Sequence, residues 1–218
     1  MSSFGSYRSV FLLCVVLLSM LFSPLFSSLG VGWSKLAFGI FWAFLIGVGG
    51  YKISSSRRWL RFYATAVFAV MATALHELLA DSTPWVTVAQ NAGILMINFG
   101  AMYAALQYAI QKDAGNAMDR TIGAICGYFL LGMAWSRLYV VAYLLLPGSF
   151  NASASADTLS EADLIYFSIV TLTTLGYGDI SAVDPYARIL SAMEAAFGTL
   201  YLAVLIAALV SEIRSDAR

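Results

Sequence analysis

The feature that most constrains this chain is a series of long apolar stretches. A bilayer core about 30 Å thick is crossed by about 20 apolar helical residues. Such segments must satisfy their backbone hydrogen bonds internally, and no stretch alternates apolar and polar residues at period two, so helices are favoured over a β-barrel. The sequence therefore predicts six transmembrane helices, over Tyr7–Leu29, Trp33–Tyr51, Arg58–Ala80, Trp85–Gln111, Thr121–Leu146 and Pro185–Val210.

The composition agrees with a membrane protein and argues against several other classes. Of 218 residues, 61% are hydrophobic and 11% charged, whereas soluble domains carry about 25% charged residues. The formal net charge is zero, so no basic surface indicates a nucleic-acid partner. Cys14 and Cys126 lie in apolar stretches, where thiols behave as small hydrophobes. We expect membrane lipid around the protein, no cofactor and no small-molecule substrate.

Lysine and arginine gather on one side of the predicted membrane. With the N-terminus in the cytoplasm, nine cationic side chains fall inside: Arg8, Lys52, Arg57, Arg58, Arg61, Lys112, Arg120, Arg214 and Arg218. Only Lys35 and Arg188 fall outside, and Arg137 lies within a span. The positive-inside rule then predicts a multi-pass protein of the cell membrane (plasma or inner) with both termini cytoplasmic.

The first apolar stretch has two interpretations. Within it, Arg8 precedes a short apolar run, and small residues follow that run at Ser27, Ser28 and Gly30, as in a signal peptide. The apolar run continues past Pro24, which favours a helix that stays in the mature protein.

One segment between the last two predicted spans breaks the pattern. Leu164–Leu172 is apolar but too short to cross a bilayer. It is typical of a re-entrant helix followed by a loop, which membranes tolerate where protein buries it or where it lines a watery cavity. Ser160, with Asp163 three residues later, predicts a helix start of the capping-box kind. The predicted fold is thus an all-α integral membrane protein with six transmembrane helices and one re-entrant helix.

The loop after the short helix reads TTLGYGD, residues 173–179. Glycine visits the left-handed backbone region freely, and Gly176 and Gly178 stand at alternate positions. A backbone that alternates between right- and left-handed regions turns successive carbonyls toward one axis. The loop is similar to the TVGYG loop of potassium channels, in which such carbonyls replace the hydration shell of the ion. Thr174 can add its hydroxyl, and Tyr177 can brace the loop from behind. An ordinary glycine turn is the alternative, and the position between two spans argues against it.

From about Thr121 to Ser211 the chain resembles the pore module of the potassium-channel superfamily: outer helix, pore helix, filter and inner helix. The resemblance implies a selectivity filter at Thr174, Leu175, Gly176, Tyr177 and Gly178, with K⁺ bound at the first four. It implies passive conduction through a homotetramer, without a catalytic step, because one chain supplies one filter. Leu175 departs from the Val or Ile usual in the family and must pack a γ-branched side chain behind the loop.

The resemblance also assigns supporting residues. Tyr166 falls where some members have a tryptophan, and its hydroxyl could reach Asp179. Gly198 stands at the position of a glycine hinge in the inner helix, although a small residue for close helix packing is an equal alternative. Four residues of the last span would face the cavity and gate: Thr199, Leu202, Ile206 and Val210. Their spacing keeps them on one helix face, which a core-packing stripe would also do.

The sequence predicts two parts, a four-helix peripheral domain at residues 1–112 and a pore domain at residues 113–218. Voltage sensors carry several arginines in the fourth span, and the fourth predicted span here contains no Lys or Arg. Its polar residues are suited to hydrogen bonds between helices; they are Gln90, Asn91, Asn98 and Gln107.

Two charged residues, Arg137 and Glu194, fall within predicted spans. Both lie roughly 13 Å below the outer helix ends at 1.5 Å per residue, so the sequence predicts an ion pair between them. Glu161, Asp163 and Asp179 are competing partners for Arg137, and snorkelling to the interface is a further alternative.

Two other functions remain open at this point. The first is a poorly selective cation channel. The second is a helical membrane protein that does not conduct, such as a receptor or assembly subunit. Potassium transporters with four pore units in one chain fit poorly, because one such unit is found.

Overall fold

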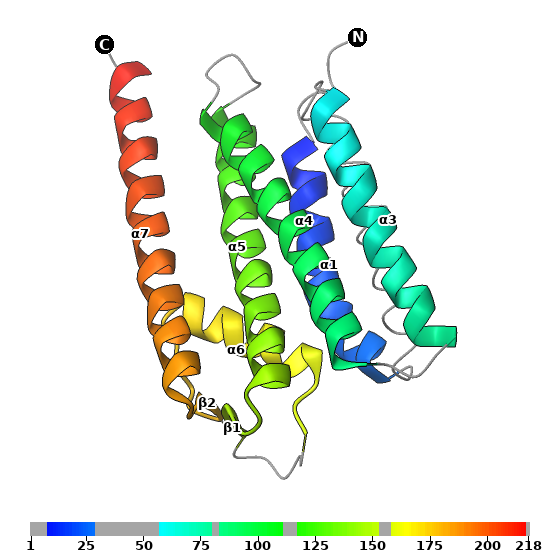
Figure 1. Cartoon of the computed structure of the whole chain (residues 1–218). Helices are drawn as coiled ribbons and strands as arrows, with labels where there is room; N and C mark the ends of the chain where they lie inside the picture. The colour runs from blue at the N-terminus through cyan, green and yellow to red at the C-terminus, as the bar shows by residue number, and fades with distance from the viewer. Residues whose placement is uncertain (1–7, 29–56, 80–82, 111–116, 153–157, 217–218) are drawn as a thin grey trace.

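The computed structural model describes residues 8–28, 57–79, 83–110, 117–152 and 158–216. In this part, five long helices run side by side: α1 (Arg8–Ser28), α3 (Arg57–Leu79), α4 (Pro84–Ile110), α5 (Ala117–Leu145) and α7 (Pro185–Asp216). The short helix α6 (Glu161–Leu172) crosses behind α5, from the side of α7 to the other side, near one end of the bundle (Figure 1). The predicted helices are therefore present, except that the predicted second span, Trp33–Tyr51, lies outside the described residues.

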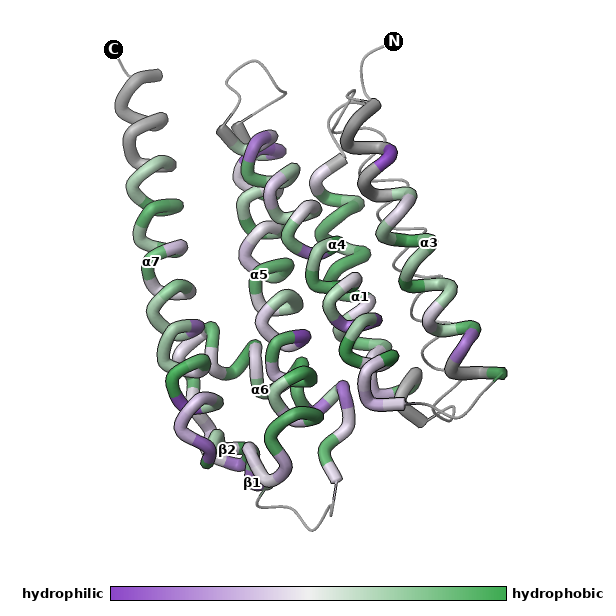
Figure 2. The backbone as a smooth tube through the Cα atoms, viewed as in Figure 1, coloured by the Kyte–Doolittle hydropathy of each residue, from purple (hydrophilic) through white to green (hydrophobic). Residues whose placement is uncertain are grey.

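Three of the described helices are long and apolar enough to cross a membrane, over Pro84–Ala109, Met118–Leu145 and Pro185–Ala208. Figure 2 shows hydrophobic residues along the length of these helices. The described parts of α1 and α3 contain shorter apolar segments, Ser9–Leu25 and Ala64–His76. The structure therefore supports a helical membrane protein, and three of the six predicted spans meet this criterion.

Helix α6 begins at the predicted capping box. The backbone N–H of Asp163 donates to Ser160 Oγ at 3.3 Å, and the backbone N–H of Ser160 donates to Asp163 Oδ2 at 2.8 Å. Two donors at the helix start, which lack partners within the helix, are satisfied in this way. The start of α6 is thus fixed by residues within one turn of each other.

The structure adds two short strands that the all-α prediction lacked. Strand β1 (Phe150–Ala152) pairs antiparallel with β2 (Ile180–Ala182), with Phe150 opposite Ala182. One strand precedes α6 and the other follows the loop after it. The pairing supplies backbone hydrogen bonds to two segments that would otherwise lack them, and it ties together the two ends of the region that contains the candidate site.

Helix α5 is the centre of the molecule, because it is largely buried whereas α7 is largely exposed. One hydrophobic cluster joins α5 to α1, α3, α4 and α6 through Val15, Val16, Val70, Ile94, Ile97, Leu130, Met133 and Ile165. A second cluster joins α5 to β1, α6 and α7. In it Phe167 packs against Tyr139 and Phe150, with ring centroids 5.0 Å and 5.3 Å apart. The first cluster contains residues from both predicted domains. The predicted boundary between these domains falls within residues 111–116, which lie outside the described part, so the division into two domains stays a prediction.

Candidate functional site

The backbone of the loop after α6 alternates in handedness. Thr174, Gly176 and Gly178 have φ angles of 58°, 58° and 80°, and the residues between them do not have positive φ. The left-handed conformation predicted for the two glycines is confirmed, whereas Thr174 was not foreseen in that region. A non-glycine residue there costs about 1–2 kcal/mol, so the surrounding structure holds Thr174 in this conformation.

The loop begins in hydrogen bonds to the last turn of α6. The backbone N–H of Thr174 donates to the carbonyl of Thr171 at 2.9 Å, and that of Leu175 donates to the carbonyl of Val170 at 2.9 Å. Both carbonyls are among the last four of α6, and the last four carbonyl groups of a helix have no hydrogen-bond partner within that helix. The C-terminal end of a helix carries partial negative charge, so the loop starts where a cation is favoured.

One hydrogen bond crosses from α6 to the far side of the loop. Tyr166 Oη donates to Asp179 Oδ2 at 2.8 Å, the contact that the sequence suggested. This bond raises the pKa of the Tyr166 phenol above its ordinary value, because it stabilises the protonated donor. The role of the pair in holding the loop stays a prediction.

The loop itself is exposed in a single chain. The side chains of Leu175 and Tyr177 are 56% and 67% exposed, and an ideal Cβ built on Gly176 or Gly178 meets nothing within 4 Å. The described part of one chain therefore packs little against the outer side of the loop. Bracing of the loop by Tyr177 stays a prediction.

At Gly198, α7 lies close to the end of α6. A Cβ added there would lie 2.3 Å from the carbonyl oxygen of Leu172, the last residue of α6. The phenol of Tyr128 donates to the same carbonyl at 3.1 Å. Helix α7 continues without interruption through this position. The packing alternative is thus supported, and a hinge at Gly198 stays a prediction.

The residues predicted to face a cavity lie on the exposed part of α7. Thr199, Leu202 and Ile206 are exposed, and the side chain of Val210 lies outside the described part. The structure of one chain leaves this surface uncovered. Their place in a cavity therefore stays a prediction.

The predicted ion pair between Arg137 and Glu194 is wrong. Arg137 Nη1 donates to Glu161 Oε2 at 2.8 Å and lies 3.5 Å from Asn91 Oδ1. Glu161, at the start of α6, was one of the competing partners. The prediction relied on the equal depth of Arg137 and Glu194 in the membrane. It failed because α7 packs against a face of α5 other than the one that carries Arg137. On α5, Glu194 is contacted by Tyr139, which lies two residues and about 200° around the helix from Arg137.

Sequence reasoning missed the groups that do contact Glu194. Ser168 Oγ and Tyr139 Oη each lie 2.5 Å from one of its carboxyl oxygens. The available signal was Ser168, a small polar residue in the mostly apolar part of α6. The predicted polar contacts of the fourth span are present in part, because Asn91 meets Arg137 and Asn98 Nδ2 donates to the carbonyl of Met133 at 3.4 Å.

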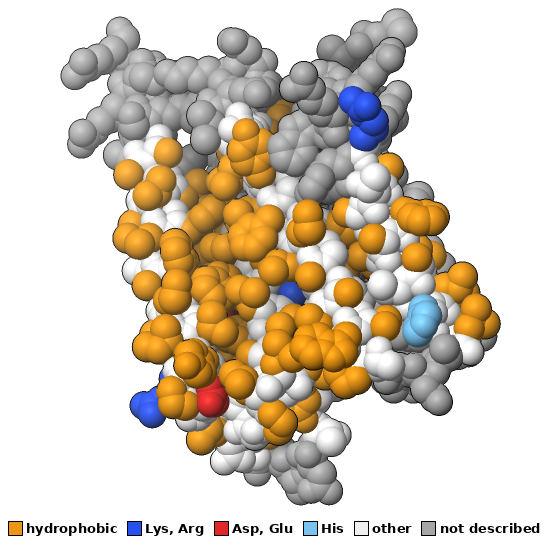
Figure 3. Space-filling view, viewed as in Figure 1, with side chains coloured by type: hydrophobic (Ala, Val, Ile, Leu, Met, Phe, Trp, Pro, Cys, Tyr) orange, Lys and Arg blue, Asp and Glu red, His pale blue; other side chains and the backbone are white. Residues whose placement is uncertain are grey.

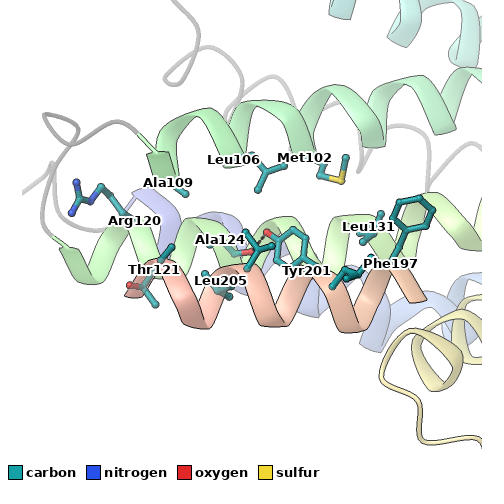
Figure 4. Close-up of a pocket in the computed structure, with 13 residues that line it drawn as sticks. Met102, Leu106, Ala109, Arg120, Thr121, Ala124, Leu131, Phe197, Tyr201 and Leu205 are labelled. Carbon is teal, nitrogen blue, oxygen red and sulfur yellow. Dashed lines mark hydrogen bonds between the residues drawn. The ribbon is translucent and has the colours of Figure 1, made fainter. Parts of the chain in front are cut away.

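A groove of about 540 Å³ lies between α4, α5 and α7. Figure 4 shows Arg120 at one end and Phe197 at the other, with mostly apolar side chains between them. Tyr201 reaches across from α7, and its hydroxyl donates to the carbonyl of Ala124 at 2.6 Å. The groove therefore opens between helices that are apolar enough to lie in a membrane.

Comparison with known proteins finds similarity in the part of the chain that contains the candidate site. Residues 124–215, which contain α6, the loop and most of α7, match the model of a family described as an ion channel. Two pore potassium channel c from Oryza sativa subsp. japonica is 40% identical over 83 residues, which are 38% of this chain and 18% of the relative. Two-pore potassium channel 5 from Arabidopsis thaliana is 35% identical over 65 residues, which are 29% of this chain and 16% of that relative.

The matched stretch thus spans less than a fifth of the length of these curated relatives. No solved structure matches the chain significantly. The resemblance of this C-terminal part of the chain to the pore module of the potassium-channel superfamily is confirmed.

Proposed function

We propose, proceeding from the ion-channel family that residues 124–215 match, that this chain is one subunit of a homotetrameric, potassium-selective channel. Potassium passes down its electrochemical gradient through the shared axis of four loops, and no catalytic step is involved. The filter of each subunit is formed by Thr174, Leu175, Gly176, Tyr177 and Gly178. The permeant K⁺ is the only ion that the function requires.

The observation that carries this proposal is the left-handed backbone at Thr174, Gly176 and Gly178. Alternation along the loop brings successive carbonyl oxygens to one side of the chain. A ring of such oxygens replaces the hydration shell of a potassium ion. The two relatives that match this stretch are named potassium channels, which supports potassium as the permeant ion.

Assembly of several chains is supported by the surface that one chain leaves uncovered. The loop is exposed, and α7 exposes large apolar side chains around much of its circumference: Tyr186, Ile189, Met193, Phe197, Leu200, Leu202, Val204 and Ile206. Figure 3 shows hydrophobic side chains over most of one face of the molecule, including α7. Lipid can cover one side of such a helix, and neighbouring subunits around a central axis would cover another.

We place the protein in the cell membrane with both termini in the cytoplasm. The excess of Lys and Arg in the segments on one side supports this orientation. The beginning of α1 and the end of α7 lie at the same end of the bundle (Figure 1). Helix α6 and its loop then lie toward the outer side, as a re-entrant segment.

Reconstituted liposomes test the proposal. Liposomes loaded with potassium and containing the purified chain should release it when a gradient is applied, and barium should block the release. Reversal potentials with potassium on one side and sodium on the other should shift strongly toward potassium. Equal permeability would instead identify a poorly selective cation channel. No barium-sensitive flux from correctly assembled protein would indicate a membrane protein that does not conduct.

A further inference from the structure

Glu194 is a buried carboxyl group that belongs neither to the loop nor to the exposed surface of α7, the two features on which the proposed function rests. It lies on α7, four residues before Gly198, and is 0% exposed. Tyr139 Oη on α5 lies 2.5 Å from its Oε2, and Ser168 Oγ on α6 lies 2.5 Å from its Oε1. One carboxyl group therefore joins the outer, short and inner helices behind the loop.

The protons available to this group can be counted. Ser168 Oγ is also 2.6 Å from the carbonyl oxygen of Gly132. Three oxygen–oxygen contacts thus follow one another, from Tyr139 to Glu194, from Glu194 to Ser168 and from Ser168 to Gly132. Each distance is that of a hydrogen bond and requires a proton between the oxygens. A carbonyl supplies no proton and each hydroxyl supplies one, so the third proton must belong to Glu194.

The charges around Glu194 lead to the same protonation state. Among the described residues no cation is ion-paired with it, and Arg137 on α5 contacts Glu161 instead. The titratable groups that face it are the phenols of Tyr139 and Tyr128, both from α5. Helix α6 contributes the hydroxyl of Ser168, which does not titrate. An unpaired charge within a membrane is strongly unfavourable, and a neutral acid avoids it.

We propose that Glu194 is a protonated carboxylic acid at neutral pH and that it positions α6 on α7 by donating a hydrogen bond to Ser168. Ser168 lies four residues before Leu172, and Glu194 lies four residues before Gly198. The Glu194–Ser168 hydrogen bond and the Gly198–Leu172 contact therefore stand one turn apart on both helices and fix their register. The loop that follows Leu172 depends on this register for its position.

Loss of the proton would leave three contacts with two protons. Ser168 could then donate either to Gly132 or to Glu194, and the remaining pair of oxygens would repel. The end of α6 would shift relative to α7, and the loop would lose its conducting geometry. This consequence rests on the proposed channel function, whereas the protonation state of Glu194 does not.

Infrared spectroscopy of the full chain in lipid tests the protonation state directly. At neutral pH the wild type should show the C=O stretching band of a protonated carboxyl group, shifted in D₂O and absent in Glu194→Gln. Glu161→Gln is the matched control, because it removes a carboxylate that is ion-paired with Arg137 and should leave the band in place. In Ser168→Ala the band should move to higher frequency, because the acid loses its acceptor. Persistence of the band in Glu194→Gln, or its absence from the wild type, would overturn the proposal.

Potassium flux at several pH values tests the positioning role. Flux through the wild type should fall as the pH rises and Glu194 ionises. Glu194→Gln keeps a neutral donor and acceptor, so its flux should persist at alkaline pH, whereas Glu194→Leu should lose flux at every pH. An alkaline loss that is identical in wild type and Glu194→Gln would overturn the positioning role. A chain without any potassium flux would contradict the channel function while the infrared result still decides the protonation state.

Discussion

At the scale of single residues, the loop after α6 depends on backbone conformations that few amino acids adopt. Gly176 and Gly178 occupy the left-handed region without a penalty, and Thr174 occupies it at a cost. The surroundings of the two glycines are open. The requirement for glycine therefore comes from the backbone angle and not from crowding.

We predict that Gly176→Ala and Gly178→Ala each abolish selective potassium flux while assembly is retained. A Cβ disfavours the left-handed conformation by about 1–2 kcal/mol, so the loop should relax to other angles and its carbonyls should turn from the axis. Flux assays and reversal potentials with potassium and sodium measure this loss. Gly148→Ala is the matched control, because Gly148 also has a positive φ of 78° but lies outside the loop. Unchanged selectivity in both loop variants would contradict the filter assignment.

The second prediction at this scale concerns the partner of Arg137. Its side chain is buried, and the ion pair with Glu161 spans 2.8 Å. Residues in contact show coupling energies of about 0.5–3 kcal/mol in double-mutant cycles, and distant ones add within about 0.5 kcal/mol. We expect a coupling energy of about 0.5–3 kcal/mol between Arg137→Met and Glu161→Met. The effects of Arg137→Met and Glu194→Met should be nearly additive.

Thermal unfolding of the purified variants in detergent provides the free-energy differences for both cycles. The Glu194 cycle is the control, because that residue lies at a similar depth but contacts Tyr139 and Ser168. Stronger coupling of Arg137 to Glu194 than to Glu161 would show that the contacts differ from those described.

At the scale of elements, α4 differs from the fourth helix of a voltage sensor. It contains no Lys or Arg along Pro84–Ile110, and its buried polar residues Asn91 and Asn98 form hydrogen bonds instead. Moving one charge through 100 mV provides about 2.3 kcal/mol. A helix without charges gains nothing from the membrane potential.

We therefore predict that opening depends only weakly on voltage. Single-channel recordings of the purified protein across a range of voltages measure the open probability directly. Rectification caused by ions moving through the loop is separated from gating by comparing open probability with single-channel current. A steep open-probability curve, equivalent to several charges per subunit, would contradict this expectation.

At the scale of the whole molecule, a single chain leaves the candidate site and the apolar surface of α7 uncovered by protein. The loop is exposed, as are the apolar side chains of α7. Burial of apolar surface is favourable in water, and in lipid close packing and hydrogen bonds favour helix association. We propose that part of this exposed surface faces the central axis of an assembly of several chains.

We predict that the purified protein contains four chains. Native mass spectrometry from detergent should give the mass of a tetramer for the wild type. Gly178→Ala should give the same mass, because it changes the backbone of the loop and leaves the apolar surface of α7 intact. A monomer or dimer that still conducts potassium would contradict the assembly proposed here.

What the sequence determines by itself is local. The described helices lie where the apolar stretches predicted them, α6 begins at the Ser160–Asp163 capping box, and Gly176 and Gly178 adopt left-handed angles. These features depend on residues within a few positions of each other, so hydrophobic length, capping and backbone freedom suffice to predict them. The motif of the loop likewise identified the pore module.

The tertiary structure decided which residues meet. Arg137 contacts Glu161, and Glu194 contacts Tyr139 and Ser168, although depth along the helices favoured a pair between Arg137 and Glu194. Each residue advances about 100° around a helix, so a partner depends on rotation as much as on depth. That rotation is set when α5, α6 and α7 pack together, through contacts such as Gly198 against Leu172 that no single stretch of sequence contains.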